Sequence, residues 1–170
     1  MPPGAKVRLA QIPAGARICF RRKTRAHMNE EGATSFRPLE DRERRLLERL
    51  IEHHWFDGRD ELRCQLESAT ARLIAQYHDN YGSIELRVEN ATPASVRYRV
   101  PVEAEYLDED GIPVWVLLHV REGVMCELEI CRADGQPLIS PPVPERLEPF
   151  SADYGALIEK TKARKRGLSM

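Results

Sequence analysis

The sequence lacks the patterns that would place it in a membrane, in a disulfide framework or in a familiar enzyme class. No apolar run approaches the roughly 18 residues of a membrane span, and the basic run that follows the weakly apolar residues 7–20 lies on the wrong side for a signal peptide. No GxSxG, HExxH, P-loop or GxGxxG motif occurs. The four cysteines are too widely spaced for a disulfide scaffold or a zinc site; they are Cys19, Cys64, Cys126 and Cys131. We therefore expect a cytoplasmic protein with reduced thiols and without a metal or other cofactor.

Lysine is missing from the middle of the chain. Residues 28–150 contain 14 arginines, no lysine and 25 acidic residues, whereas residues 1–27 contain seven basic residues and no acidic one. Residues 151–170 contain five basic and two acidic residues. An acidic body repels nucleic acid, because binding to phosphates needs clustered Lys and Arg, and it attracts a basic partner. The alternative is that the acidity only aids solubility.

Composition also divides the chain into three parts. We expect residues 1–35 to be a basic disordered extension, with Met28 as a candidate natural start; the alternative is a targeting or nucleic-acid-binding arm. Residues 36–140 are long enough to bury a core and form the expected α+β domain. Residues 141–170 are Pro-rich and then basic, which predicts a tail that runs extended over the surface or ends in a short helix.

Two stretches have the apolar spacing of helices. In residues 38–55, apolar side chains recur every three or four positions with Arg and Glu between them, and Pro38 suits a first turn. These apolar side chains are Leu39, Leu46, Leu47, Leu50, Ile51 and Trp55. Gly58 marks the end of this helix, and residues 59–69 predict a second one with Leu62, Leu66 and Ala69 inward.

From Ala71 onward the apolar period changes to two, which is typical of strands. Alternation predicts five strands, at residues 71–78, 83–88, 96–106, 112–120 and 124–132. We expect them to form a five-stranded antiparallel meander, with both helices packed on its Val/Tyr/Leu/Ile face. Turn chemistry and face matching also predict registers. The expected pairs are Tyr77 with Ile84, Ala75 with Leu86, Ala104 with Val116, Glu105 with Trp115, Leu118 with Cys126, Val116 with Leu128 and Trp115 with Glu129.

The second face of this sheet carries the candidate functional residues. An aromatic and apolar stripe lies between carboxylates there; its members are Glu103, Glu105, Trp115, Leu117, His119, Glu127 and Glu129, with Arg97, Arg99, Met125 and Cys131 beside them. As a binding face it would use Trp115 as anchor and the acids as a steering rim. As a catalytic site it would use His119 as general base. The third interpretation is that the tail around residues 141–150 covers the stripe and the charges form cross-strand pairs.

No metal site is expected. The acidic turn before Gly111 fails the calcium-loop pattern, because Tyr106 and Leu117 occupy positions that need oxygen ligands. Cys126 and Cys131 are five apart, so on a strand they point to opposite faces. We expect Cys126 to face the core with Leu128.

The segment from residue 106 to residue 138 resembles a small bacterial domain family of unknown function. The shared pattern is an acidic turn ending in Asp-Gly, an apolar strand, a Gly turn, the strand "ELEI", and a second Asp-Gly. It falls on Asp108, Asp110, Gly111, Gly123, Glu127 to Ile130, Asp134 and Gly135. The helix "RPLEDRERRLLERLI" is similar to the family's usual opening, so the resemblance covers residues 36–140. Some look-alikes are similar to immunity partners of bacterial toxins, which implies a neutralising role.

The sequence thus predicts a non-enzymatic cytoplasmic binding protein that meets a basic protein partner through its acidic body, and the resemblance implies an immunity-like role for it. The first alternative is a small enzyme or ligand-binding protein that uses His119 and the neighbouring glutamates. The second is a nucleic-acid-associated protein that uses the basic ends.

Overall fold

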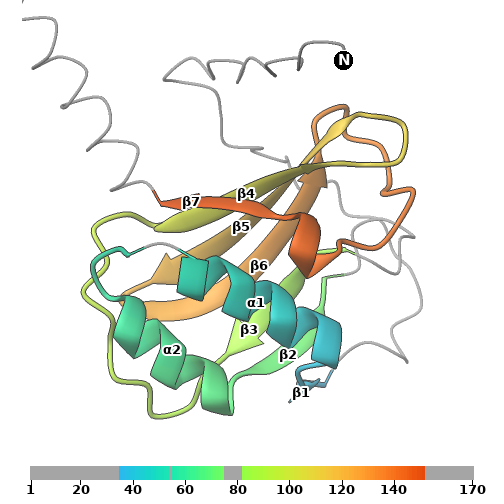
Figure 1. Cartoon of the computed structure of the whole chain (residues 1–170). Helices are drawn as coiled ribbons and strands as arrows, with labels where there is room; N and C mark the ends of the chain where they lie inside the picture. The colour runs from blue at the N-terminus through green and yellow to red at the C-terminus, as the bar shows by residue number, and fades with distance from the viewer. Residues whose placement is uncertain (1–34, 54, 75–81, 152–170) are drawn as a thin grey trace, which may run out of the picture. The chain divides into compact units, whose positions relative to one another are not determined.

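The computed structural model describes residues 35–53, 55–74 and 82–151, and these form an α+β fold (Figure 1). The helices are α1 (Asp41–His53), α2 (Arg59–Ser68) and the short 3-10 helix η1 (Pro144–Arg146). The strands are β1 (Arg37–Pro38), β2 (Thr70–Leu73), β3 (Ile84–Arg87), β4 (Val102–Leu107), β5 (Pro113–Arg121), β6 (Val124–Arg132) and β7 (Glu148–Ser151). Within this part of the chain, no helix is long and apolar enough to cross a membrane.

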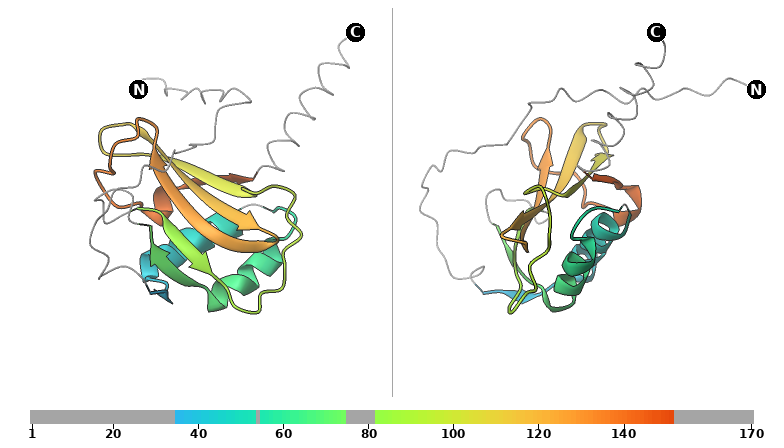
Figure 2. Two further views of the ribbon diagram at one scale, coloured as in Figure 1. Left: turned by 180° about the vertical axis from the view of Figure 1, so that it is seen from behind. Right: turned by 90° about the vertical axis from the view of Figure 1, so that its left-hand side faces the viewer.

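The described strands form one antiparallel sheet in the order β1-β2-β3-β6-β5-β4-β7. Both α-helices lie on one face of this sheet, and the other face has no described helix over it (Figure 2). The α+β class and the two helices are confirmed. The five-stranded meander is wrong, because β3 pairs with β6 instead of β4 and because β1 and β7 add strands at the edges. Residues 88–101 carry the chain past β6 and β5 to β4, so consecutive strands need not be neighbours.

Helix α1 begins later and ends earlier than its apolar spacing suggests. Its first turn is capped by the Glu43 carboxylate, which accepts a 2.8 Å hydrogen bond from the backbone N–H of Glu40, and Pro38 pairs with Thr70 in the sheet instead. The inward side chains are buried as predicted; they are Leu46, Leu47, Leu50 and Ile51. Trp55 lies beyond the helix and is 69% exposed, while Phe56 is buried in the core.

Two strand predictions in the middle of the chain need correction. β2 starts directly after α2 and pairs Leu73 with Ile84 and Ala71 with Leu86. The expected partners Ala75 and Tyr77 lie outside the described residues. The register differs by four positions, an even number, so the side chains of β3 still face the predicted sides.

β4 is shorter than the predicted strand over residues 96–106. Pro101 precedes its first residue and has no N–H to donate to a ladder. Arg97 lies 3.8 Å from Asp57 near the helices, so it does not join the second face of the sheet, and Tyr98 is 40% exposed. The β4–β5 register is confirmed, with Ala104 opposite Val116 and Glu105 opposite Trp115.

The β5–β6 hairpin contains a bulge that sequence reasoning missed. Arg121 pairs with Val124 across a two-residue turn, in which Glu122 and Gly123 have φ values of 53° and 78°, as a type I′ turn requires. The ladder then shifts between His119 and Val120. One extra residue on β6 turns Met125 into the core and takes Cys126 out of it, which reverses their predicted positions.

The bulge also resets the pairing further along the hairpin. Leu118 faces Leu128, Val116 faces Ile130 and Trp115 faces Cys131, each two positions from the prediction. The faces of Glu127, Leu128, Glu129 and Ile130 are nevertheless those predicted. None of the three described cysteines forms a disulfide.

Candidate functional site

The sheet face that lies away from the helices is here called the outer face. Its side chains come from the half-buried positions that alternate with the core residues of β3 to β7. It comprises Glu85, Glu103, Glu105, Trp115, Leu117, His119, Glu127, Glu129, Cys131 and Phe150, with the exposed Glu148 at the edge. All seven residues predicted for the candidate site therefore lie on one face, whereas Met125 and Arg97 do not.

Strand β5 provides the central column of the outer face. Trp115, Leu117 and His119 alternate along it. Leu117 lies between Glu103 on β4 and Glu129 on β6. The outer face is thus an apolar and aromatic column flanked by carboxylates on both neighbouring strands.

Two side chains of the column hold carboxylates in place. The indole Nε1–H of Trp115 donates a 3.3 Å hydrogen bond to Glu105 Oε2. His119 Nε2 lies 2.8 Å from Glu129 Oε2, and because an ionised carboxylate only accepts, Nε2 carries the proton. His119 Nδ1 is buried and has no hydrogen-bond partner among the described residues. Nε2 is thus engaged by Glu129, and burial keeps Nδ1 from direct contact with a substrate.

Two carboxylates of the outer face, Glu103 and Glu127, lie in an environment that disfavours their charge. Burial raises the pKa of Glu103, and the neighbouring charge of Glu105 raises it further. Burial also raises the pKa of Glu127, and Glu129 acts in the same direction, whereas His119, Arg99 and Arg121 oppose the rise. None of the described residues forms an ion pair with Glu103, Glu105 or Glu127. A cation placed beside them would relieve this cost.

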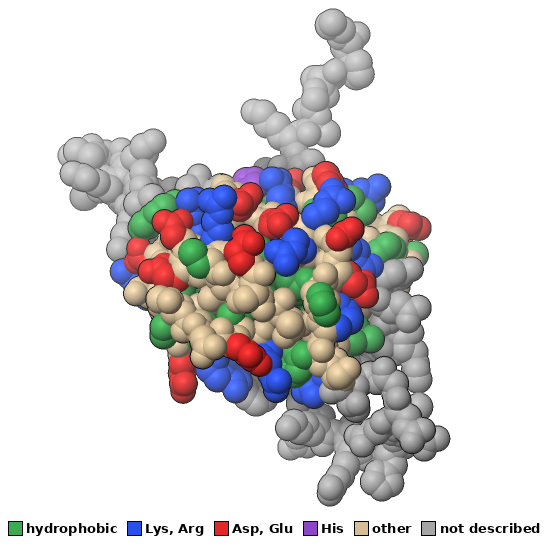
Figure 3. Space-filling view, turned by 90° about the horizontal axis from the view of Figure 1, so that it is seen from below, with side chains coloured by type: hydrophobic (Ala, Val, Ile, Leu, Met, Phe, Trp, Pro, Cys, Tyr) green, Lys and Arg blue, Asp and Glu red, His purple; other side chains and the backbone are tan. Residues whose placement is uncertain are grey.

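The cations near the outer face gather at its margins. Arg72 on β2 pairs with Glu85, and the ring of Phe36 lies 4.9 Å from the Arg72 guanidinium and 4.2 Å from that of Arg87. The β2 margin therefore carries two arginines, one of which is paired with Glu85. On the surface seen from below in Figure 3, acidic side chains (red) and basic side chains (blue) are intermixed.

A second cluster explains the acidic turns that carry the family resemblance. Arg132 reaches three aspartates: its Nη1 lies 2.6 Å from Asp108, and its Nη2 lies 2.8 Å from Asp110 and 2.9 Å from Asp134. The Asp108 carboxylate also accepts hydrogen bonds from the backbone N–H groups of Glu109 and Ile139 and from the hydroxyl of Ser140. Burial alone would raise the pKa of Asp108, but these bonds outweigh it and hold that pKa at about 2.

The Arg132 cluster is structural, because its cation is already part of the chain. Sequence reasoning assigned these turns and missed Arg132. The alternation along β6 could have identified it. Arg132 follows Leu128 and Ile130 at alternate positions, so its side chain points to the core side, where an arginine needs carboxylates. Among the described residues, no group of three His, Cys, Asp or Glu could hold a metal ion.

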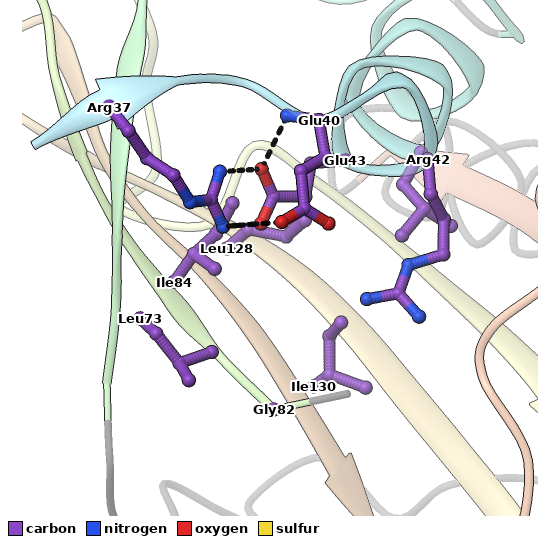
Figure 4. Close-up of a pocket in the computed structure, with 10 residues that line it drawn as sticks. Arg37, Glu40, Arg42, Glu43, Leu73, Gly82, Ile84, Leu128 and Ile130 are labelled. Atoms are coloured by element: carbon purple, nitrogen blue, oxygen red, sulfur yellow. Dashed lines mark hydrogen bonds and ion pairs between the residues drawn. The ribbon is translucent and has the colours of Figure 1, made fainter. Parts of the chain in front are cut away.

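A cavity of about 260 Å³ lies between the start of α1 and the inner face of the sheet (Figure 4). Apolar side chains of the sheet form one side, and they are Leu73, Ile84, Leu128 and Ile130; Leu46 of α1 also lines the cavity. On the other side both Nη atoms of Arg37 donate to the Glu43 carboxylate at 2.8 Å. Burial would raise the pKa of Glu43, but these bonds and the N–H of Glu40 hold it below its usual range. The polar groups of this pair satisfy each other, so they offer a ligand little.

Comparison with known proteins reaches the level of a family and no further. No curated protein and no solved structure matches the chain. A family model described as "Domain of unknown function (DUF6984)" matches residues 36–142, which include both α-helices, strands β1 to β6 and the Arg132 cluster. The chain belongs to this family of domains of unknown function.

Proposed function

We propose that the protein is a non-enzymatic binding protein that recognises a basic surface of another protein through its outer face. One observation carries the proposal: Glu103, Glu105 and Glu127 flank a shared apolar column, and none of them forms an ion pair with a described residue. Half-buried carboxylates without an ion-pair partner cost folding energy. That cost is explained if a partner supplies the cation.

The chemistry of the column supports a protein partner. Trp115 and Leu117 offer apolar contact area in the centre, and aromatic anchors ringed by polar groups are typical of binding hot spots. Arg or Lys side chains of a partner could lie over Trp115 while pairing with Glu105 or Glu129. The acidic body would also steer a basic partner toward this face.

The geometry of His119 favours binding over catalysis. A general base needs a nitrogen within reach of the proton that it abstracts, but Nε2 of His119 is engaged by Glu129 and Nδ1 is buried. The His119–Glu129 pair instead fixes the orientation of a carboxylate beside Leu117. We therefore assign His119 a positioning role on the binding face.

The resemblance to immunity partners of bacterial toxins narrows the proposal. A protein that neutralises a toxin must recognise it as a folded partner, and a preformed sheet face suits that task. We propose an immunity-like role in the cytoplasm, with a basic protein as the partner.

The proposal is tested by comparing the proteins that the wild type and variants of the outer face capture. The full chain is immobilised as wild type, as Glu127→Lys/Glu129→Lys, as Trp115→Ala, and as the control Glu67→Lys/Glu109→Lys, whose sites are exposed and lie off the outer face. We expect wild type and control to retain the same basic protein and both outer-face variants to lose it. Equal capture by all four proteins, or capture of an acidic protein only, would refute the proposed function.

A further inference from the structure

We propose that the basic segment at residues 160–166 docks in cis on the outer face and competes there with the basic partner. The inference rests on the proposed function, because the basic segment and the basic partner would bind the same face. It adds a regulatory occupant, supplied by the chain itself.

The path of the chain brings this segment to the outer face. β7 pairs with β4 so that Phe150 lies opposite Glu103 and Ser151 opposite Val102. The last described residue therefore lies beside the first carboxylates of the outer face. β7 runs along the sheet edge, so it does not cover the column as the third interpretation of the sequence supposed.

The available length is sufficient. Lys160 is nine residues beyond Ser151, and nine extended residues span about 30 Å. Neighbouring strands lie about 4.8 Å apart, so Glu129 on β6 is only about 10 Å across the sheet from β4. The segment reaches both rows of carboxylates without full extension.

The charges of the segment complement those of the outer face. The segment "KTKARKR" has five basic residues among seven, and the last three of them are consecutive. A tethered segment acts at an effective concentration in the millimolar range. A few ion pairs beside an apolar column are therefore enough to keep it bound for part of the time.

The N-terminal basic segment is the weaker candidate. Its seven basic residues are spread over residues 1–27. The described chain begins next to Phe36, whose ring lies against Arg72 and Arg87. A basic segment that approaches from this margin meets the cations of Arg72 and Arg87, and the Glu85 carboxylate there is already paired with Arg72, so repulsion disfavours the approach.

The distribution of lysine makes a direct test possible. Side-chain amines occur only at Lys6, Lys23, Lys160, Lys162 and Lys165. A carbodiimide joins a carboxylate to an amine as an amide only where the two touch. We therefore expect carbodiimide treatment of the full chain at low salt, followed by peptide mass spectrometry, to link Lys160, Lys162 or Lys165 to Glu103, Glu105, Glu127 or Glu129.

Matched variants and isotope mixing define the outcome. The links to β6 should be lost in the variant Glu127→Gln/Glu129→Gln and should persist in the control Glu67→Gln/Glu109→Gln. In the wild type they should disappear at 1 M salt, where charges are screened beyond about 3 Å. Mixed ¹⁴N and ¹⁵N chains should give links within one chain. Absence of these links, links from Lys6 or Lys23 instead, or links between two chains would each overturn docking of residues 160–166 in cis.

This test separates the inference from the proposed function. Crosslinking needs no partner, so its failure leaves the outer face free for one, and the capture experiment decides that question by itself. If both hold, neutralising the segment in the full chain, as Lys160→Gln/Lys162→Gln/Arg164→Gln/Lys165→Gln/Arg166→Gln, should tighten capture of the basic partner. Unchanged or weaker capture would show that the segment is no competitor.

Discussion

Arg132 and Asp108 form a buried ion pair that joins the end of β6 to the turn after β4. Their side chains are 4% and 0% exposed, and the Arg132 Nη1 atom lies 2.6 Å from Asp108 Oδ2. Asp110 and Asp134 complete the coordination of the same guanidinium. The pair therefore fixes the acidic turn, the second Asp-Gly turn and the chain at Ile139 relative to one another.

Removal of the Arg132 guanidinium should destabilise the fold severely. Arg132→Met leaves Asp108 buried without its partner, and an unpaired buried charge is among the most costly single changes. We expect the ratio of folded to unfolded chains to fall on the order of 100-fold, measured by urea unfolding. Arg121→Met, at an exposed position on β5, should change it little. Equal effects of the two substitutions would contradict the role assigned to Arg132.

The Asp108 carboxylate should make stability depend on acid pH. Its pKa is about 2 in the folded chain against a usual 3.8, so the folded state binds this proton less readily than the unfolded state does. The contribution is present above about pH 4 and is lost as the pH falls toward 2. Asp134, whose pKa the Arg132 hydrogen bonds also hold at about 2, acts in the same window.

Unfolding curves between pH 2 and pH 7 measure this dependence. The free energy of unfolding of the wild type should fall steeply below pH 4. Asp108→Asn should be less stable at pH 7 and should show a shallower loss below pH 4. A variant that keeps the full acid slope would show that Asp108 is not responsible.

Gly123 and Gly111 provide a matched pair of turn glycines. Both have positive φ, 78° and 80°, so alanine is strained at either position. At Gly111 a Cβ atom would meet nothing within 4 Å, but at Gly123 it would lie 2.7 Å from Pro93 Cβ and 2.8 Å from the backbone of Ala94. Gly111→Ala should cost about 1 kcal/mol of unfolding free energy, and Gly123→Ala distinctly more. Equal thermal shifts for the two would argue against close packing of residues 93–94 on this turn.

The charges of Glu103 and Glu127 on the outer face should cost stability. Because burial and neighbouring charges raise the pKa values of Glu103 and Glu127, the protonated forms favour folding, and this contribution is lost as the pH rises through the raised values. At pH 7, Glu103→Gln and Glu127→Gln should each raise the free energy of unfolding by about 0.2–1 kcal/mol. The gain should vanish near pH 4, and Glu67→Gln on α2 should show none. A loss of stability at pH 7 would mean that these charges already have partners.

Much of the outer face could be predicted from the sequence because its residues follow one rule. Period-two alternation assigns Glu103, Glu105, Trp115, Leu117 and Glu129 to one side whichever strands are neighbours. The β4–β5 register was predictable because the turn before Gly111 is a local feature. Residues close in sequence thus determined most of the candidate site.

The errors arose where distant or competing effects decide the structure. The pairing of β3 with β6 depends on contacts between Ile84 and Leu128, 44 residues apart, and no local pattern reports them. The bulge beside Cys126 arises because the two-residue turn at Gly123 would otherwise place glutamates in the core. Arg132 was missed because its partners lie on two separate turns.

Chemical-shift mapping with a hepta-arginine peptide is the most direct test of the outer face as a surface for basic partners. In the ¹⁵N-labelled full chain, we predict the largest changes at the Trp115 indole and at the amides of Leu117, His119 and Glu129. Glu67 and Glu109, exposed acids elsewhere, should change little. Changes spread evenly over exposed acids, or concentrated on the helices, would contradict the account.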